Sequence, residues 1–195
     1  MKREATIRRT TRETDIETRV LLDGSGAADV RTGIGFLDHM LTALALHGRM
    51  DISLRCEGDL HVDDHHTVED CALALGQAID EALGRRRGVR RFGSAFAPLD
   101  EALCRAVIDL SGRPFAAVNL ALKRDRLGAM SCENVGHFFS SLATGMRATL
   151  HLDVLRGEND HHKAEAAFKS LALALREALA VDDLAVVPST KGALA

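Results

Sequence analysis

The motif His-His-x-x-Glu occurs twice in the chain, and its members are His65, His66, Glu69, His161, His162 and Glu165. Imidazole nitrogens and carboxylate oxygens are suitable ligands for Mn, Fe, Co, Ni and Zn. On a helix, residues four apart share a face, whereas adjacent residues diverge by about 100°. We therefore expect Glu69 beside His65. Each motif is expected to offer one face to one metal ion and its other histidine to a second ion.

The two motifs belong to a longer internal repeat. The run beginning at His39 matches the run beginning at His137, 98 residues later, and the motifs themselves match at an offset of 96. A single His-His pair is weak evidence for a metal site, but a repeated copy with glutamate in place is much stronger. The repeat adds His39 and His137, which gives three histidines and one glutamate per ion. Such a set leaves positions open for a substrate on an octahedral metal.

Apolar and β-branched residues indicate the elements that must hold these side chains. Apolar residues at helical spacing predict helices over 35–46 and 65–83. Asp63 and Asp64 directly precede the second helix and could cap its free N–H groups. Alternating or β-branched segments predict strands at 5–9, 14–22, 52–57, 91–97, 103–109 and 115–122.

The order of these elements repeats, so we predict two halves. Residues 1–88 form the first half, which ends in a basic segment, and residues 89–195 form the second half with a C-terminal tail. Each half is expected to contain strands, a helix, a strand and a second helix, and the two share one compact domain. The predicted fold class is α+β, an internally duplicated unit with a mixed sheet packed on helices.

Composition excludes several classes of function. The chain has 195 residues, is 46% hydrophobic and carries a net charge of -3 from acidic and basic residues mixed along its length, which does not indicate nucleic-acid binding. It contains neither a secretory-type N-terminus nor a membrane-length apolar run, so a cytoplasmic location without membrane contact is expected. The widely spaced cysteines suggest reduced thiols; they are Cys56, Cys71, Cys104 and Cys132.

Four segments closely resemble the imidazoleglycerol-phosphate dehydratase family, and they occur in the family's order and spacing. They are 33–40 (GIGFLDHM), 63–70 (DDHHTVED), 159–163 (NDHHK) and 188–192 (PSTKG). The resemblance implies a hydro-lyase of L-histidine biosynthesis, which removes water from D-erythro-imidazole glycerol phosphate to give imidazole acetol phosphate. It also implies two Mn²⁺ ions per chain and a fold of the ribosomal protein S5 domain 2 type. The expected assembly is a homo-oligomeric octahedral shell of 24 subunits in which neighbours complete each active site.

The resemblance assigns roles to individual residues. Glu13 matches a substrate-contacting glutamate and is the candidate proton shuttle, since Glu69 and Glu165 would be metal ligands. His47 matches a position that lines the same pocket and is the second candidate catalytic residue, although its repeat counterpart is Gly145. The metal ligands are His39, His65, His66, Glu69, His137, His161, His162 and Glu165. The residues expected to hold the substrate phosphate are Arg91, Arg113, Lys169, Ser189 and Lys191.

Two other readings remain open from the residues themselves. A dinuclear metallohydrolase acting on a phosphorylated small molecule would use the same ligand types, but it usually needs a carboxylate that bridges its ions. A metal-buffering shell protein would need no phosphate-binding tail. Without the resemblance, each proposed phosphate-binding residue would read as an ordinary solvated side chain.

Overall fold

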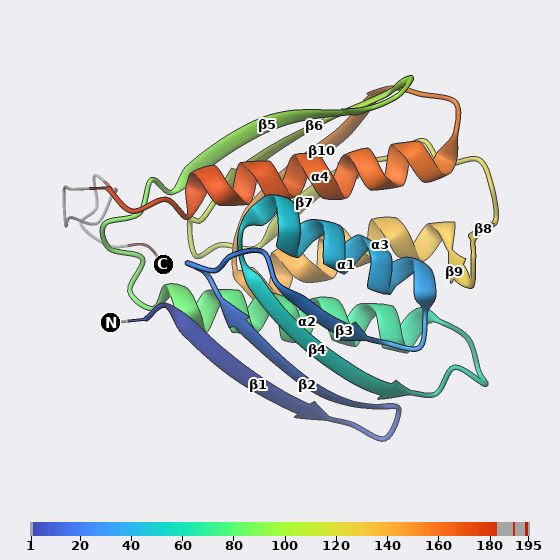
Figure 1. Cartoon of the computed structure of the whole chain (residues 1–195), viewed down its shortest axis with the longest axis horizontal. Helices are drawn as coiled ribbons and strands as arrows, with labels where there is room; N and C mark the ends of the chain where they lie inside the picture. Colours follow the sequence, from blue (N-terminus) through green and yellow to red (C-terminus); the bar gives the residue numbers. More distant parts are fainter. Residues whose placement is uncertain (1, 183–188, 190–193, 195) are drawn as a thin grey trace.

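The computed structural model describes residues 2–182, 189 and 194, in which helices lie between two four-stranded sheets (Figure 1). The first sheet has the order β1 (Glu4–Thr10), β2 (Thr14–Leu21), β4 (Asp51–Gly58) and β3 (Ala28–Arg31). The second has the order β5 (Phe92–Leu99), β6 (Ala102–Asp109), β10 (Thr149–Arg156) and β7 (Phe115–Asn119). A short pair, β8 (Arg126–Leu127) and β9 (Met130–Ser131), precedes the third helix.

Both large sheets are mixed in the same way. In each, three strands run antiparallel and the last strand, β3 or β7, pairs parallel to its neighbour. A parallel pair needs a crossover connection, and helices provide it here. The predicted α+β class with mixed sheets packed on helices is confirmed. The strand expected over 115–122 ends at Asn119, and β3 was not predicted.

The four helices found in the described residues form two layers between the sheets. They are α1 (Gly35–Gly48), α2 (His65–Leu83), α3 (Cys132–Met146) and α4 (Asp160–Ala178). Helices α1 and α2 pack on the first sheet, and α3 and α4 pack on the second. Across the middle, α1 packs against α4 and α2 against α3 (Figure 1). Each helix–helix contact therefore joins an early part of the chain to a late part.

The start of α2 shows how the first motif is held. The Asp63 side chain accepts a hydrogen bond from the backbone N–H of His65 at 2.8 Å, as predicted for a cap. Asp64 does not cap the helix with its side chain, which corrects that part of the expectation. Its carboxylate instead accepts from the backbone N–H and hydroxyl of Ser131, each at 2.7 Å. Asp64 therefore ties the start of α2 to the start of α3.

Apolar side chains fill the space between the sheets and helices. The rings of Phe138, Phe139 and Phe168 lie with centroids 4.6–5.6 Å apart at the centre of the second half of the chain. All four cysteines are buried, and their reduced state stays a prediction. Among the described residues, no helix combines the length and apolar character that a membrane span requires.

Candidate functional site

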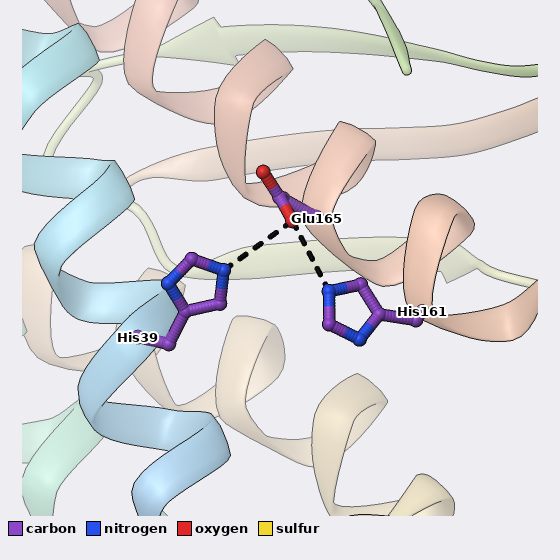
Figure 2. A group of neighbouring side chains, drawn as sticks. All are labelled: His39, His161 and Glu165. Atoms are coloured by element: carbon purple, nitrogen blue, oxygen red, sulfur yellow. Dashed lines mark hydrogen bonds and ion pairs between the residues drawn. The ribbon is translucent and has the colours of Figure 1, made fainter. Parts of the chain in front are cut away.

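Helices α1 and α4 bring His39, His161 and Glu165 together, and we call these residues the first group (Figure 2). The Nε2 atoms of His39 and His161 lie 3.4 and 3.2 Å from Oε2 of Glu165. One candidate ligand atom from each residue lies within 4.8 Å of the other two. His161 and Glu165 are one turn apart on α4, as the motif predicted, whereas His39 arrives from α1.

Glu165 also contacts a cation on its own helix. Nζ of Lys169 lies 2.6 Å from Oε1 of Glu165. The other carboxylate oxygen, Oε2, faces the two histidines. Burial works to raise the pKa of Glu165, but Lys169 and His39 outweigh it and the pKa lies below its ordinary value. The carboxylate is therefore kept ionised, which is the form that binds a cation.

Helices α2 and α3 form a second group from His65, Glu69 and His137. Nε2 of His137 lies 3.3 Å from Glu69 Oε1, and Nε2 of His65 lies 3.9 Å from Glu69 Oε2. Nδ1 of His65 hydrogen-bonds to Oδ1 of Asn134 at 3.1 Å, which fixes the orientation of that ring. The two groups thus have the same composition, and in each a histidine and a glutamate four residues apart on one helix are joined by a histidine from another helix.

The donor sets fit a first-row divalent metal ion. Two imidazole nitrogens and a carboxylate, without a thiolate, suit Mn and its neighbours in the series. Nε2 of His137 is buried and makes no hydrogen bond among the described residues, although it faces Glu69. A buried ring nitrogen without a hydrogen bond is costly unless something binds it. The structure therefore brings six of the predicted ligands into two groups able to hold an ion.

The remaining two predicted ligands, His66 and His162, lie outside both groups. Each ring is nearly perpendicular to that of its motif neighbour, with centroids 5.9 Å apart for His65 and His66 and 6.3 Å apart for His161 and His162. Hydrogen bonds to Asp59 and Glu101, respectively, raise the pKa of these two histidines. Within one chain, each group consequently has two histidines and one glutamate rather than the expected three and one.

The two predicted catalytic residues occupy different places. Glu13 lies in the turn between β1 and β2, and its Oε1 is 3.6 Å from Nε2 of His66. His47 lies in the last turn of α1. Burial and then the charge of Lys169 lower the pKa of His47, while Glu165 acts in the opposite direction. Glu13 is therefore associated with an outlying histidine, and His47 with the surroundings of the first group.

Among the described residues predicted to hold phosphate, Arg91, Lys169 and Arg113 have different surroundings. Arg91 forms a two-pronged ion pair with Asp109, with contacts of 2.6 and 3.0 Å. Lys169 is paired with Glu165, and Arg113 is exposed in the turn between β6 and β7. Ser189 is half-buried. Lys191 lies outside the described residues.

Several residues around the groups were missed by the sequence reasoning. Asp59, Glu101 and Asn134 orient predicted histidines but belong to no repeated motif. One sequence feature could have pointed to Glu101. It follows β5, the first strand after residue 88, just as Glu13 follows β1, the first strand of the chain. Asp59 and Asn134 had none, since only packing brings them to the histidines.

The comparisons with known proteins agree over nearly the whole chain. The family model described as imidazoleglycerol-phosphate dehydratase matches residues 32–175. A protein of that name from Candida glabrata is 54% identical over 209 residues, covering 98% of this chain and 100% of that protein. The protein of the same name from Cereibacter sphaeroides is 55% identical over 194 residues, with coverage of 98% and 100%. A relative from Phytophthora nicotianae is longer, and the match covers only 43% of it, at 59% identity.

Solved structures lead to the same family. The crystal structure of IGPD from Pyrococcus furiosus in complex with (S)-C348 has a TM-score of 0.83 and 39% identity, covering 96% of this chain and 100% of that one. The enzyme from Staphylococcus aureus, at 34% identity, has a TM-score of 0.83 and coverage of 91% and 99%. This chain therefore belongs to the imidazoleglycerol-phosphate dehydratase family, whose members are hydro-lyases of histidine biosynthesis.

Proposed function

We propose that this chain dehydrates D-erythro-imidazole glycerol phosphate to imidazole acetol phosphate and water, using two Mn²⁺ ions per chain. The observation that carries the proposal is the pair of matching His/Glu groups, each built between two helices in a chain of this family. Imidazole and carboxylate ligands suit Mn²⁺ but also its neighbours, so the identity of the metal is part of the proposal. The cytoplasmic location predicted from the sequence stays a prediction.

The first group would hold one ion and the second group another. When bound, the ions supply Lewis acidity, which favours the deprotonated form of the substrate's imidazole ring. Glu13 is the residue proposed to move the proton removed from the substrate carbon toward the departing hydroxyl group. Loss of that hydroxyl as water leaves an enol that becomes the ketone. With Glu69 and Glu165 engaged as ligands, Glu13 is the carboxylate left for this role among the residues assigned to the site.

Copies of the chain would complete one another's sites. His66 and His162 lie away from both groups, so we propose that each binds an ion held by another copy and brings that ion's ligands to three histidines and one glutamate. Glu13 would accompany His66 into that site. Arg91, Arg113, Lys169, Ser189 and Lys191 are proposed to bind the substrate phosphate where copies meet. The 24-subunit shell expected from the family resemblance would provide such contacts.

The division of the chain is also a proposal. Residues 1–88 and 89–195 would be repeat halves of one compact domain. Support comes from the two sheets, which share one pattern of antiparallel and parallel pairing, and from the two groups, which share one composition.

The dinuclear hydrolase alternative has less support. Hydrolases of that type hold their ions about 3.5–4 Å apart, commonly with a shared carboxylate. Here Glu69 and Glu165 belong to separate groups, and the two groups share no residue among those described. Within the described part of the chain, neither glutamate is therefore placed as the bridge that such a mechanism needs.

The decisive experiment is turnover of imidazole glycerol phosphate by chelator-stripped protein, before and after addition of Mn²⁺, with the ketone product followed directly. Restored turnover would support both the substrate and the metal. Binding of two ions per chain without any product would overturn the proposed substrate but keep the metal sites. The same protein would then be assayed for phosphate release from small phosphorylated molecules.

A further inference from the structure

Each outlying histidine is held at one ring nitrogen by a carboxylate. Nδ1 of His66 hydrogen-bonds to Oδ2 of Asp59 at 2.9 Å, and Nδ1 of His162 to Oε2 of Glu101 at 2.7 Å. An ionised carboxylate can only accept, so in both cases Nδ1 carries the proton. A neutral ring in this tautomer has its lone pair on Nε2. Nε2 is also the atom that the other four histidines offer to the two groups.

The Glu101 carboxylate is held in place by backbone groups, whereas Asp59 is anchored through its own backbone. Oε1 of Glu101 accepts the backbone N–H groups of Glu158 and Asn159 at 3.1 and 2.8 Å, which leaves Oε2 for His162. The hydrogen bond from His162 and those from the backbone lower the pKa of Glu101 to about 2. Directly after β4, the backbone N–H of Asp59 donates to the carbonyl of Glu13 at 3.0 Å. Asp59 is thereby fixed to the turn that carries Glu13.

The in-chain histidines of the two motifs have other partners. His161 lies 3.2 Å at Nε2 from the glutamate of its own helix, and His65 is held at Nδ1 by an amide oxygen rather than by a carboxylate. At Nε2 of His66 and His162, the carboxylates of Glu13 at 3.6 Å and Asp100 at 3.9 Å are beyond hydrogen-bonding distance. The carboxylate at Nδ1 is therefore the hydrogen-bond acceptor that orients each of these two rings.

We infer that Asp59 and Glu101 are positioning residues that fix the tautomer and orientation of His66 and His162, so that each presents Nε2 to an ion held by another copy of this chain. This inference rests on the proposed function, because it takes both histidines to be metal ligands. Carboxylate partners of this kind raise the basicity of a ligating imidazole, and their loss typically weakens metal binding by about 10–100-fold.

The test is Mn²⁺ titration of the full-length protein, with free ion measured by electron paramagnetic resonance. Asp59→Asn and Glu101→Gln keep the size of each side chain but allow the amide to donate to Nδ1, which favours the tautomer with a proton on Nε2. Each is expected to weaken Mn²⁺ binding by about 10–100-fold. The matched control is Glu57→Gln on the exposed face of β4, which is expected to bind Mn²⁺ as the parent does.

A double variant separates positioning from general damage. If Glu101 acts through His162, Glu101→Gln added to His162→Ala should cause no further loss of Mn²⁺ affinity. The same holds for Asp59→Asn added to His66→Ala. Glu101→Asp, which restores a carboxylate, should recover part of the affinity. Midpoints of thermal unfolding of the metal-free variants should stay at the parent value.

Several outcomes would overturn the inference. The inference is wrong if Asp59→Asn and Glu101→Gln both bind Mn²⁺ within about twofold of the parent affinity. It is also wrong if the losses of Mn²⁺ affinity in the double variants are additive. Normal Mn²⁺ affinity in His66→Ala and His162→Ala would remove the ligand role and the inference with it. Failure of the proposed reaction is a distinct result, because a parent protein that binds Mn²⁺ without dehydrating the substrate still allows every affinity comparison above. A parent that bound no Mn²⁺ would overturn both.

Discussion

Gly76 of α2 and Gly145 of α3 lie in direct backbone contact where the two helices cross. A Cβ added to Gly76 would lie 2.9 Å from the carbonyl carbon of Gly145, and one added to Gly145 would lie 3.1 Å from Cα of Gly76. The crossing lies two helical turns beyond Glu69 and His137, on the same pair of helices. Its closeness therefore sets how near these two residues of the second group can approach each other.

Replacing Gly76 by alanine should push α2 and α3 apart. The added Cβ would meet backbone atoms of Leu142 and Met146 at 2.6 and 2.7 Å, which rigid backbone cannot relieve cheaply. We expect a loss of about 1–3 kcal/mol in the free energy of unfolding. One Mn²⁺ site per chain should also weaken while the other stays near the parent affinity. Urea denaturation and Mn²⁺ titration measure the two effects.

Gly136 offers a matched control for this substitution. It lies in the same helix α3, but an added Cβ would have nothing within 4 Å. Gly136→Ala should therefore stabilise the helix by about 0.5–1 kcal/mol, because alanine loses less backbone entropy on folding. Equal destabilisation by the two substitutions would show that the close crossing is not the cause.

Glu13→Gln tests the proton-transfer role. The variant keeps the size of the side chain and removes its ability to take a proton. We expect kcat to fall by about 10²–10⁴-fold, the usual contribution of a positioned acid or base. Mn²⁺ content measured by elemental analysis should not change. A variant that kept most of its turnover would exclude Glu13 as the proton shuttle.

Arg113→Ala tests the phosphate site. Arg113 is exposed in this chain, which leaves its guanidinium accessible to a ligand. Loss of a charge-assisted hydrogen bond of about 1.5–3 kcal/mol should raise KM by roughly 10–100-fold with little change in kcat. The control is Arg8→Ala on the outer face of the first sheet, where Arg8 pairs with Glu17. An unchanged KM for Arg113→Ala would remove this residue from the phosphate site.

Asp51 should make stability depend on pH in acid. Its Oδ1 accepts hydrogen bonds from the backbone N–H groups of Ser25, Gly26 and Ala27, at 2.7, 3.0 and 2.9 Å. These bonds, that of Ala27 first, hold the pKa of Asp51 below its ordinary value. A carboxyl group with a lowered pKa in the folded state stabilises the protein above its unfolded pKa of about 3.9. That stabilisation is lost as the pH falls through the folded value.

Asp51→Asn should remove this acid-sensitive contribution. Urea denaturation of metal-free protein should show the variant less stable than the parent near neutral pH. The difference should shrink as the pH is lowered below about 4, because the parent's carboxylate becomes protonated there. A difference that stayed constant down to about pH 3 would mean that the charge of Asp51 does not contribute.

Local patterns predicted the helices that carry the motifs. The predicted helix over 65–83 coincides with α2, and the one over 35–46 falls two residues short of the end of α1 at Gly48. Apolar spacing and a closing glycine are local signals, so they can be read directly. Strand β3 (Ala28–Arg31) could not be predicted from local patterns because it is short and largely exposed, and its pairing with β4 is set by packing.

In the candidate site, only the contacts between residues of the same helix could be predicted from the sequence. Spacing placed His65 next to Glu69 and His161 next to Glu165, since each pair lies one turn apart. Spacing could not predict that His39 would lie beside His161 and Glu165, because that contact depends on how helices from distant parts of the chain pack. Residues such as Asp59 reach a histidine through a loop and have no spacing rule that would reveal them.

Each group takes one helix from the chain before the linker at 84–91 and one helix from the chain after it. Neither segment alone could form a group. If the two segments were separate chains, they would have to associate in solution. Joining them makes that encounter intramolecular, with an effective concentration of roughly millimolar order for a short linker. The assembly of both groups within one chain is thereby independent of how dilute the protein becomes.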